Sequence, residues 1–178
     1  LSVESNPFGH SRYGPPFPVT CLLDRPAPSE TFIRRELELL RQRGWPLTVR
    51  ILTGTPDALP FAWQALPAAD RRALLRAAGR RLREEWPRSP VTALRLLRRL
   101  PQAASLLHAV RHDGTRLLHA QFAGITADLT GLAAQTAGLP WSCAVHARDV
   151  FAVPPPLLFR RLRGAAAVTA CSQQAANA

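Results

Sequence analysis

A histidine, an arginine and an aspartate follow one short apolar stretch, and their spacing makes them the strongest candidates for chemistry in this sequence. The stretch Trp141–Val145 is long enough for a buried strand and too short for a helix. It delivers His146 at its carboxyl end, with Arg148 and Asp149 directly beyond. Open parallel sheets bind ligands outside the carboxyl ends of their strands, and an aspartate near an imidazole can fix its tautomer. The pattern predicts a site at this strand end, formed by His146, Arg148 and Asp149.

Two further segments place polar residues where a site of this kind needs them. His119 and Gln121 end another strand, which begins at Arg116. Ser29, Glu30 and Thr31 stand where the loop after the first strand meets a helix N-terminus, whose free N–H groups favour a phosphate or a sugar hydroxyl. A plain helix cap at 29–31 and a structural histidine at 119 remain alternative interpretations.

Motifs for common cofactors and metals are missing from the sequence. No Gly-x-Gly-x-x-Gly follows a strand, and there is neither a P-loop nor an Asp-x-Asp pair to hold a divalent metal against a nucleotide sugar. A zinc site would have to combine dispersed ligands with no known spacing, namely His119, Cys143, His146 and Cys171. We therefore expect no metal. Cys21, Cys143 and Cys171 are expected to be small buried hydrophobes in a reducing compartment.

The apolar runs predict an alternating α/β chain. Residues 1–16 are typical of an irregular tail, and 17–178 of one domain. Strand, helix and strand in quick succession require a parallel sheet, so we expect a Rossmann-like sheet with flanking helices. The expected strands are 17–23, 47–52, 116–119, 141–145 and 165–170, and the expected helices are 29–43, 123–137, 156–163 and one from Ser172 onward.

An arginine-rich insertion at about 68–112 interrupts this alternation with two or three helices. The chain has a net charge of +11 and no lysine, and 11 of its 23 arginines fall between residues 70 and 112. Such a surface attracts acidic lipid, nucleotide diphosphate or nucleic acid, although a codon bias explains an arginine-only composition equally well. The faces expected to be buried carry Leu74, Leu75, Ala78, Leu82 and Trp86, then Leu94, Leu96, Leu97 and Leu100. The residues expected to face outward, toward a membrane, are Arg72, Arg76, Arg80 and Arg83.

Together, these segments resemble the N-terminal domain of family 4 glycosyltransferases, the retaining enzymes of the two-domain B-type fold. The closest likeness is to the colanic-acid and exopolysaccharide branch. Pro28–Ile33, continuing to Arg43–Gly44, is similar to that branch's opening motif, and Val145–Phe151 to its "AHA-basic-D-hydrophobic-aromatic" element. His119–Ala123 is similar to its "HAHFA" element, with Gln121 in place of the second histidine. The resemblance covers residues 17–54 and 115–178.

The resemblance implies retaining transfer of a sugar from a nucleotide-sugar to a polysaccharide or lipid-linked acceptor, without a metal. His146 would approach the donor sugar, and Asp149 would support its loop, so these two are the expected catalytic residues. Arg148 is expected to bind substrate. Ser29, Glu30 and Thr31 would line the cleft near the diphosphate or acceptor, and His119 and Gln121 would help bind acceptor. Ser172, at the end of the last strand motif, is also expected to bind substrate. The family's C-terminal domain and its diphosphate-binding residues are missing from this sequence, so we expect the chain alone to be inactive.

A non-catalytic alternative stays open at this point. The arginine-rich helices would dock on an anionic membrane surface or on nucleic acid. Nucleic acid is the weaker version, because aromatic residues make up 7% of the chain and no stacking motif interleaves the arginines. The two functions can coexist in a peripheral enzyme. The expected location is the cytoplasm, with peripheral contact at the inner face of the membrane as an option.

Overall fold

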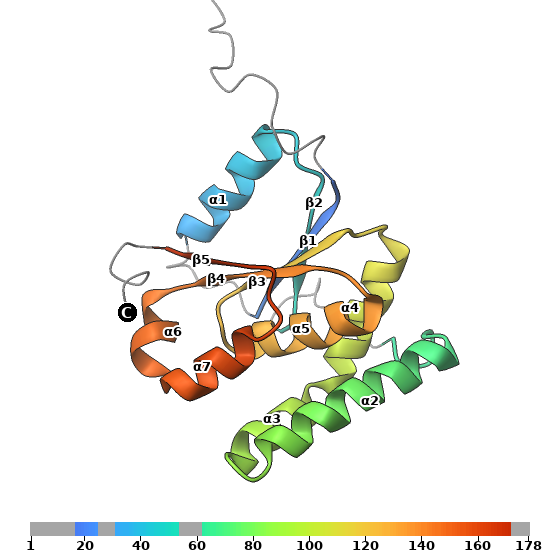
Figure 1. The fold of residues 1–178 in the computed structure, drawn as a ribbon. Coiled ribbons are helices and arrows are strands. Elements are labelled where there is room, and N and C mark those ends of the chain that lie inside the picture. Colours follow the sequence, from blue (N-terminus) through green and yellow to red (C-terminus); the bar gives the residue numbers. More distant parts are fainter. Residues whose placement is uncertain (1–16, 25–30, 54–61, 172–178) are drawn as a thin grey trace, which may run out of the picture.

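The computed structural model describes residues 17–24, 31–53 and 62–171. These residues form strands and helices that alternate along the chain (Figure 1). The strands are β1 (Val19–Leu23), β2 (Leu47–Ile51), β3 (Leu117–Gln121), β4 (Trp141–Val145) and β5 (Ala167–Ala170). The helices are α1 (Thr31–Gln42), α2 (Ala68–Glu85), α3 (Pro90–Arg98), α4 (Leu100–His112), α5 (Ile125–Ala137), α6 (Ala147–Ala152) and α7 (Pro155–Leu162).

The strands form one parallel sheet in the order β2-β1-β3-β4-β5, which confirms the α/β, Rossmann-like prediction. After β1 the chain moves one way along the sheet to β2, and after β3 it moves the other way to β4 and β5. The direction therefore reverses between β1 and β3. In open parallel sheets, this reversal leaves a crevice at the carboxyl ends of the two strands.

Local sequence signals explain where several helices end. Gly44, Gly138 and Gly164 have φ angles of +78°, +71° and +84°, in the left-handed region that glycine adopts without a Cβ penalty. Each follows one of the expected helices, so the predicted ends of α1, α5 and α7 are confirmed. Pro101 does not continue α3 but lies in the first turn of α4, where its missing N–H costs nothing. The short helix α6 was not predicted, and the start of the predicted last helix at Ser172 lies outside the described residues.

The two faces of the sheet are covered unequally. Figure 1 shows α1 on one face, and α5 with α2, α4 and α7 on the other. The main core lies on the α5 face, where Leu22, Leu118 and Leu129 are completely buried. On the opposite face, a smaller cluster joins Ile33 and Leu37 of α1 to Cys21 and Leu23 of β1. We call these the α5 face and the α1 face.

The arginine-rich insertion forms α2, α3 and α4, as predicted, but its apolar residues divide differently. Leu74, Ala78 and Leu96 are buried as expected. Four others are instead between 42% and 54% exposed, so the prediction that they are buried is wrong. They are Leu75 of α2, Trp86 directly after α2, and Leu94 and Leu97 of α3. The reason is that α5 can cover one side of each helix, and these residues lie beyond its reach.

No helix in the described ranges is both long and apolar enough to cross a bilayer.

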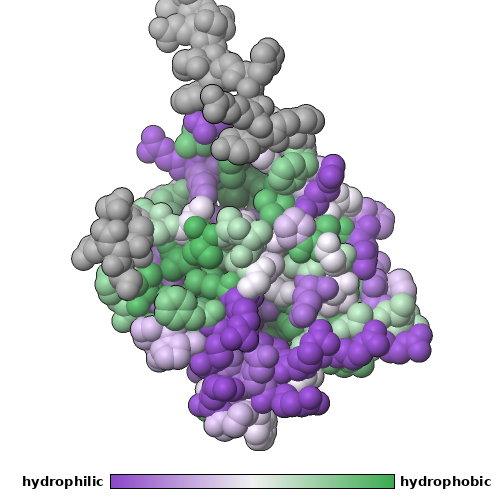
Figure 2. Space-filling view, viewed as in Figure 1, coloured by the Kyte–Doolittle hydropathy of each residue, from purple (hydrophilic) through white to green (hydrophobic). Residues whose placement is uncertain are grey.

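The surface differs from one end of the molecule to the other. In Figure 2, hydrophilic residues dominate the lower part, which α2 and α3 form in Figure 1. Arg72, Arg76, Arg80 and Arg83 are all exposed, so the predicted outward direction of these four side chains is confirmed. Apolar surface instead gathers near β5 and α6.

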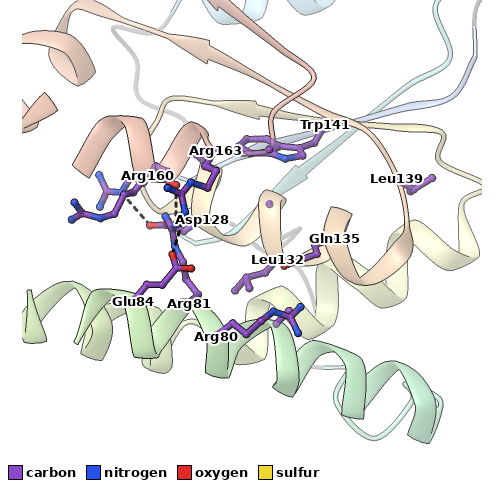
Figure 3. Close-up of a pocket in the computed structure, with 15 residues that line it drawn as sticks. Arg80, Arg81, Glu84, Asp128, Leu132, Gln135, Leu139, Trp141, Arg160 and Arg163 are labelled. Atoms are coloured by element: carbon purple, nitrogen blue, oxygen red, sulfur yellow. Dashed lines mark hydrogen bonds and ion pairs between the residues drawn. The ribbon is translucent and has the colours of Figure 1, made fainter. Parts of the chain in front are cut away.

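Buried ion pairs fasten α7 and α2 to α5 (Figure 3). Arg81 Nη2 donates to Asp128 Oδ1 at 3.0 Å, and Arg161 Nε donates to Asp128 Oδ2 at 3.2 Å. Arg160 donates two hydrogen bonds to the buried Glu85 carboxylate, at 2.9 and 3.2 Å. Burial raises the pKa of Asp128, and the charges of Arg161 and Arg81 oppose that rise. These ion pairs therefore join α2, α5 and α7, and removal of one partner would leave the other as an unpaired buried charge.

We expect Asp128→Asn to lower the free energy of unfolding by about 3 kcal/mol, because it leaves two mostly buried guanidinium groups without their shared carboxylate. Chemical denaturation followed by circular dichroism measures the change. Glu84→Gln is the matched control. Its carboxylate is 46% exposed and lies 3.9 Å from Arg163, so its loss should leave the stability nearly unchanged. Equal effects of the two substitutions would contradict the role given to the buried pairs.

Candidate functional site

The carboxyl ends of β1, β3 and β4 meet at one edge of the sheet. β1 and β3 are neighbours at the position where the chain direction reverses, and β4 lies directly beside β3. The residue pairing places Gln121 of β3 beside Ala144 of β4, so His146 follows at the next position on the α1 face. The structure therefore brings Gln121 and His146 together at the carboxyl edge of the sheet, beside the strand reversal where such sheets bind ligands.

Polar side chains of β3 and β4 share the α1 face. Alternate residues of each strand point to opposite sides of a sheet. Leu118 and Ala120 join the core on the α5 face, which leaves His119 and Gln121 on the α1 face. By the same alternation, Ser142 and His146 lie there beside them. The α1 face of these two strands thus presents a polar row in place of an apolar core.

A chain of hydrogen bonds runs from α1 to β4 through Gln121. Gln121 Nε2 donates to Glu36 Oε2 at 3.2 Å, and Gln121 Oε1 lies 3.3 Å from His146 Nε2. A carboxylate only accepts hydrogen bonds, so the amide nitrogen must face Glu36 and the amide oxygen must face the imidazole. His146 Nε2 must therefore carry a proton and donate it to Gln121. The sequence suggested that the Asp149 carboxylate would fix this tautomer. Gln121 does so instead, together with the backbone N–H of Asp149, which donates to the other ring nitrogen.

The imidazole of His146 is packed between two aromatic rings. Its centroid is 4.4 Å from that of Phe122 and 5.1 Å from that of Phe32, which projects from the first turn of α1. The residue is 7% exposed. Its side chain also accepts from the backbone N–H of Asp149 in a capping box, so both sides of the ring are engaged. The orientation of the His146 ring is therefore fixed by its neighbours, and the buried ring contacts α1 through Phe32.

Phe122 has a strained backbone at the crevice. Its φ of +73° lies in the left-handed region, which a bulky side chain rarely adopts and which costs on the order of 1–3 kcal/mol. The hydroxyl of Thr126 stabilises the turn, since its Oγ1 lies 2.7 Å from Gln121 O and 2.8 Å from Phe122 O. Backbone strain of this kind persists only where the surrounding structure stabilises it, and it occurs most often at functional sites. Here it directs the Phe122 ring onto His146.

The other predicted site residues differ in how they relate to this cluster. Asp149 is buried, and its Oδ2 accepts from the backbone N–H of His146 at 3.0 Å, so it caps α6. Arg148 is exposed on α6. Thr31 is exposed at the start of α1. Ser29, Glu30 and Ser172 lie outside the described residues.

His119 has one satisfied and one unsatisfied ring nitrogen. Its Nδ1 lies 2.8 Å from Ser142 Oγ, whereas its buried Nε2 has no hydrogen-bond partner in the structure. Burial lowers the pKa of His119, His146 adds to that effect, and the negative charge of Glu36 opposes it. The ring is therefore kept neutral, and its Nε2 is an unused hydrogen-bonding group beside Gln121.

The buried thiols are unsuited to nucleophilic chemistry. Burial, reinforced by the charge of Glu36, raises the pKa of Cys21 to about 12. Burial raises the pKa of Cys143 to about 12 as well. The thiolate is the reactive form of cysteine, so neither group is activated at neutral pH. The prediction of buried cysteines is confirmed for these two and wrong for Cys171, which is exposed at the end of β5.

A hollow of about 390 Å³ lies on the α5 face between α2, α5 and α7 (Figure 3). Its arginines include Arg81, Arg160 and Arg161, which are committed to Asp128 and Glu85. It contains none of the strand-end residues at the crevice. Within the described ranges, no three His, Cys, Asp or Glu side chains gather as a metal ion would require. The hydrogen-bonded chain from Glu36 to His146 makes the carboxyl edge the candidate site.

Sequence reasoning did not identify Glu36, Phe32 and Ser142 as site residues. Phe32 and Glu36 are four residues apart on α1 and hence share a helical face. This spacing was the one sequence feature that could have linked them to the site. Phe32 is 46% exposed, unlike its buried neighbour Ile33, and contacts His146. Ser142 occupies a position on the α1 face of β4 that alternation in Trp141–Val145 predicts, but nothing in the sequence pairs it with His119.

Comparison with known proteins adds no family assignment, because no protein-family model and no curated protein matches the chain.

The neutral state of His119 makes the stability of the fold depend on pH. The unfolded chain takes up a proton below about pH 6.5, where the folded chain resists it. The free energy of unfolding should therefore fall as the pH falls from 6.5 to the lowered pKa of the folded state, and level off below it. Denaturant titrations across this range measure the slope, and His119→Gln should reduce it. His112→Gln, which removes an imidazole that is 83% exposed, should not. An unchanged slope in His119→Gln would contradict this account.

Proposed function

We propose that this chain is the acceptor-side domain of a retaining glycosyltransferase of the two-domain B-type, and that it works with a second α/β domain that binds the nucleotide part of a nucleotide-sugar. The acceptor is a polysaccharide or a lipid-linked sugar. The observation that carries the proposal is the polar chain from Glu36 through Gln121 to His146, at the carboxyl edge where the sheet changes direction. The motifs that resemble family 4 enzymes supply these same strand ends.

The geometry favours recognition of a sugar by stacking and hydrogen bonding. Sugars present hydroxyl groups around the ring and C–H groups on its faces. The exposed edge of Phe32 offers an apolar surface beside His146, and His119 has an unused ring nitrogen nearby on β3. A sugar that approaches from the α1 side would contact Phe32, and its hydroxyl group would bind His119 where it displaces the side chains that bury Nε2. This is the mixture of a few polar groups and an aromatic surface that small polar ligands need.

His146 acts in this proposal by position and not as a general base. Its Nε2 proton is directed at Gln121, and its other nitrogen is taken up in the α6 cap. A base needs a free lone pair within reach of the proton it removes. His146 therefore shapes the wall against which the reacting sugar lies. In a retaining transfer, the departing nucleoside diphosphate is stabilised by charges and dipoles, which the second domain supplies.

The direct test is sugar transfer by the product of the complete reading frame that encodes this chain. A panel of nucleotide-sugars is incubated with polyprenyl-phosphate-linked and polysaccharide acceptors, and the anomeric configuration of the product is read by NMR. We expect transfer with retention, and we expect His146→Ala to lower kcat/KM by about 100-fold, because the reacting groups lose their alignment. The 178-residue chain alone should not transfer sugar.

His112→Ala is the matched control, since it removes an exposed imidazole near the opposite edge of the sheet and should keep full activity. Wild-type activity in His146→Ala would overturn the assignment of the site. Transfer by the isolated chain would overturn the need for a second domain. If no member of the panel is a substrate of the full product, the assignment as a glycosyltransferase is wrong.

Substitution of Phe32 tests the stacking surface separately. We expect Phe32→Ala to raise KM for the sugar by up to about tenfold with kcat little changed, because stacking binds the ground state and the transition state alike. Leu39→Ala is the control, since Leu39 is similarly exposed on α1. A fall in kcat at constant KM would show that Phe32 does not bind the sugar but positions His146.

A further inference from the structure

The hairpin of α2 and α3 carries an apolar surface that no other part of the described chain covers. Trp86, at the end of α2, is 54% exposed, and Val91, Leu94 and Leu97 of α3 are 58%, 42% and 49% exposed. The three α3 residues are spaced three apart and so form one stripe along the helix. Leu97 and Trp86 border a common groove of about 370 Å³, which is lined mainly by carbon. We call Trp86, Val91, Leu94 and Leu97 the hairpin stripe.

Arginines flank the hairpin stripe. Arg83 borders the same groove, and Arg95 and Arg98 lie on the exposed side of α3. None of these three side chains forms an ion pair within the part of the chain that the structure describes. Of the two nearby carboxylates, Glu85 is buried against Arg160, and Glu84 lies near Arg163. The surface thus combines exposed aliphatic side chains, one indole and uncompensated positive charge.

An anionic lipid bilayer has the chemistry that fits this combination. Its phosphates attract arginine, its acyl region accepts aliphatic side chains, and its interface accommodates an indole with one polar edge. Nucleic acid offers the charge but has no apolar layer to receive Val91, Leu94 and Leu97. A second copy of the chain would bring like charges together across the contact, which is unfavourable.

We propose that the hairpin stripe docks the protein on anionic phospholipid, with α2 and α3 lying along the membrane surface. The sequence pointed to Arg72, Arg76, Arg80 and Arg83 for such a role. Arg80 borders the ion-paired hollow on the α5 face, whereas Arg83 lies beside the stripe. The structure therefore moves the centre of the membrane surface from α2 toward the turn into α3. This proposal stands independently of the sugar-transfer site, because the stripe lies on the other side of the sheet from α1.

The test is co-sedimentation of the protein with phosphatidylcholine vesicles made with and without phosphatidylglycerol, at low and high salt. We expect binding to the anionic vesicles alone, and its loss at high salt as the charges are screened. Leu94→Ser with Leu97→Ser should weaken the binding about tenfold or more by removing apolar contact. Arg95→Gln with Arg98→Gln should weaken it to a similar degree by removing charge. Circular dichroism shows whether each variant is folded.

Matched variants elsewhere keep this test specific. Phe159→Ser removes a 74% exposed apolar side chain from α7, and Arg34→Gln with Arg35→Gln removes two exposed charges from α1. Both should bind vesicles as the wild type does. The proposal is overturned if the wild type does not bind anionic vesicles at low salt, if these controls lose as much binding as the stripe variants, or if the double leucine variant binds normally.

Trp86 supplies a second, local readout. Entry of its indole into the bilayer interface should shift tryptophan emission to shorter wavelength when anionic vesicles are added, and Trp86→Phe should abolish the shift. A shift that persists in Trp86→Phe, or its complete absence while the wild type sediments with vesicles, would place the contact elsewhere. Sedimentation of the wild type with duplex DNA but not with vesicles would identify nucleic acid as the partner and overturn the proposal.

Discussion

The structure depends on how the two faces of one parallel sheet are covered. On the α5 face, small side chains of α5 such as Ala127, Ala133 and Ala134 are buried, and apolar residues of β3 and β4 complete a continuous core. On the α1 face, α1 packs over β1 and β2 and leaves β3 and β4 without an apolar cover. Here β3 carries His119 and Gln121, and His146 follows the end of β4. A polar group buried at such a position is costly unless it is hydrogen-bonded. That requirement accounts for the chain from Glu36 to His146, which joins a helix, a strand and a strand end.

The sequence was most informative where a single residue determines local conformation. Gly44, Gly138 and Gly164 end helices at positive φ, and the largely apolar run Trp141–Val145 forms β4 with the predicted bounds. The sequence was least informative where partners distant in the chain decide the outcome. Periodicity shows that an apolar residue lies on a helical face, but not whether another element reaches that face, so Trp86 and Leu97 were wrongly expected in the core.

The candidate site shows the same division. Strand ends and the motif around His146 were visible in the sequence, and they do converge at the edge where the chain direction reverses. The tautomer of His146 was not predictable, because it depends on Gln121, which is oriented in turn by Glu36 from a different element. A glutamine at position 121 weakened the resemblance to the family motif. In the structure it accepts from the imidazole and donates to the carboxylate, a combination that a neutral histidine, with one donor and one acceptor nitrogen, would satisfy in another geometry.

Two groups of arginines differ in burial and pairing. One group forms buried ion pairs that join helices, and the other is exposed beside the hairpin stripe. Arg81, Arg160 and Arg161 are mostly buried and paired with Asp128 and Glu85, so they join helices and attract no ligand. Arginines beside the hairpin stripe face solvent next to exposed aliphatic side chains. A codon bias would account for a chain with arginine and no lysine, but it would not account for unpaired charge and exposed apolar surface together on one hairpin. That coincidence is what a surface in contact with both water and lipid requires, and it lies away from the crevice, which leaves the α1 face open to a polar ligand.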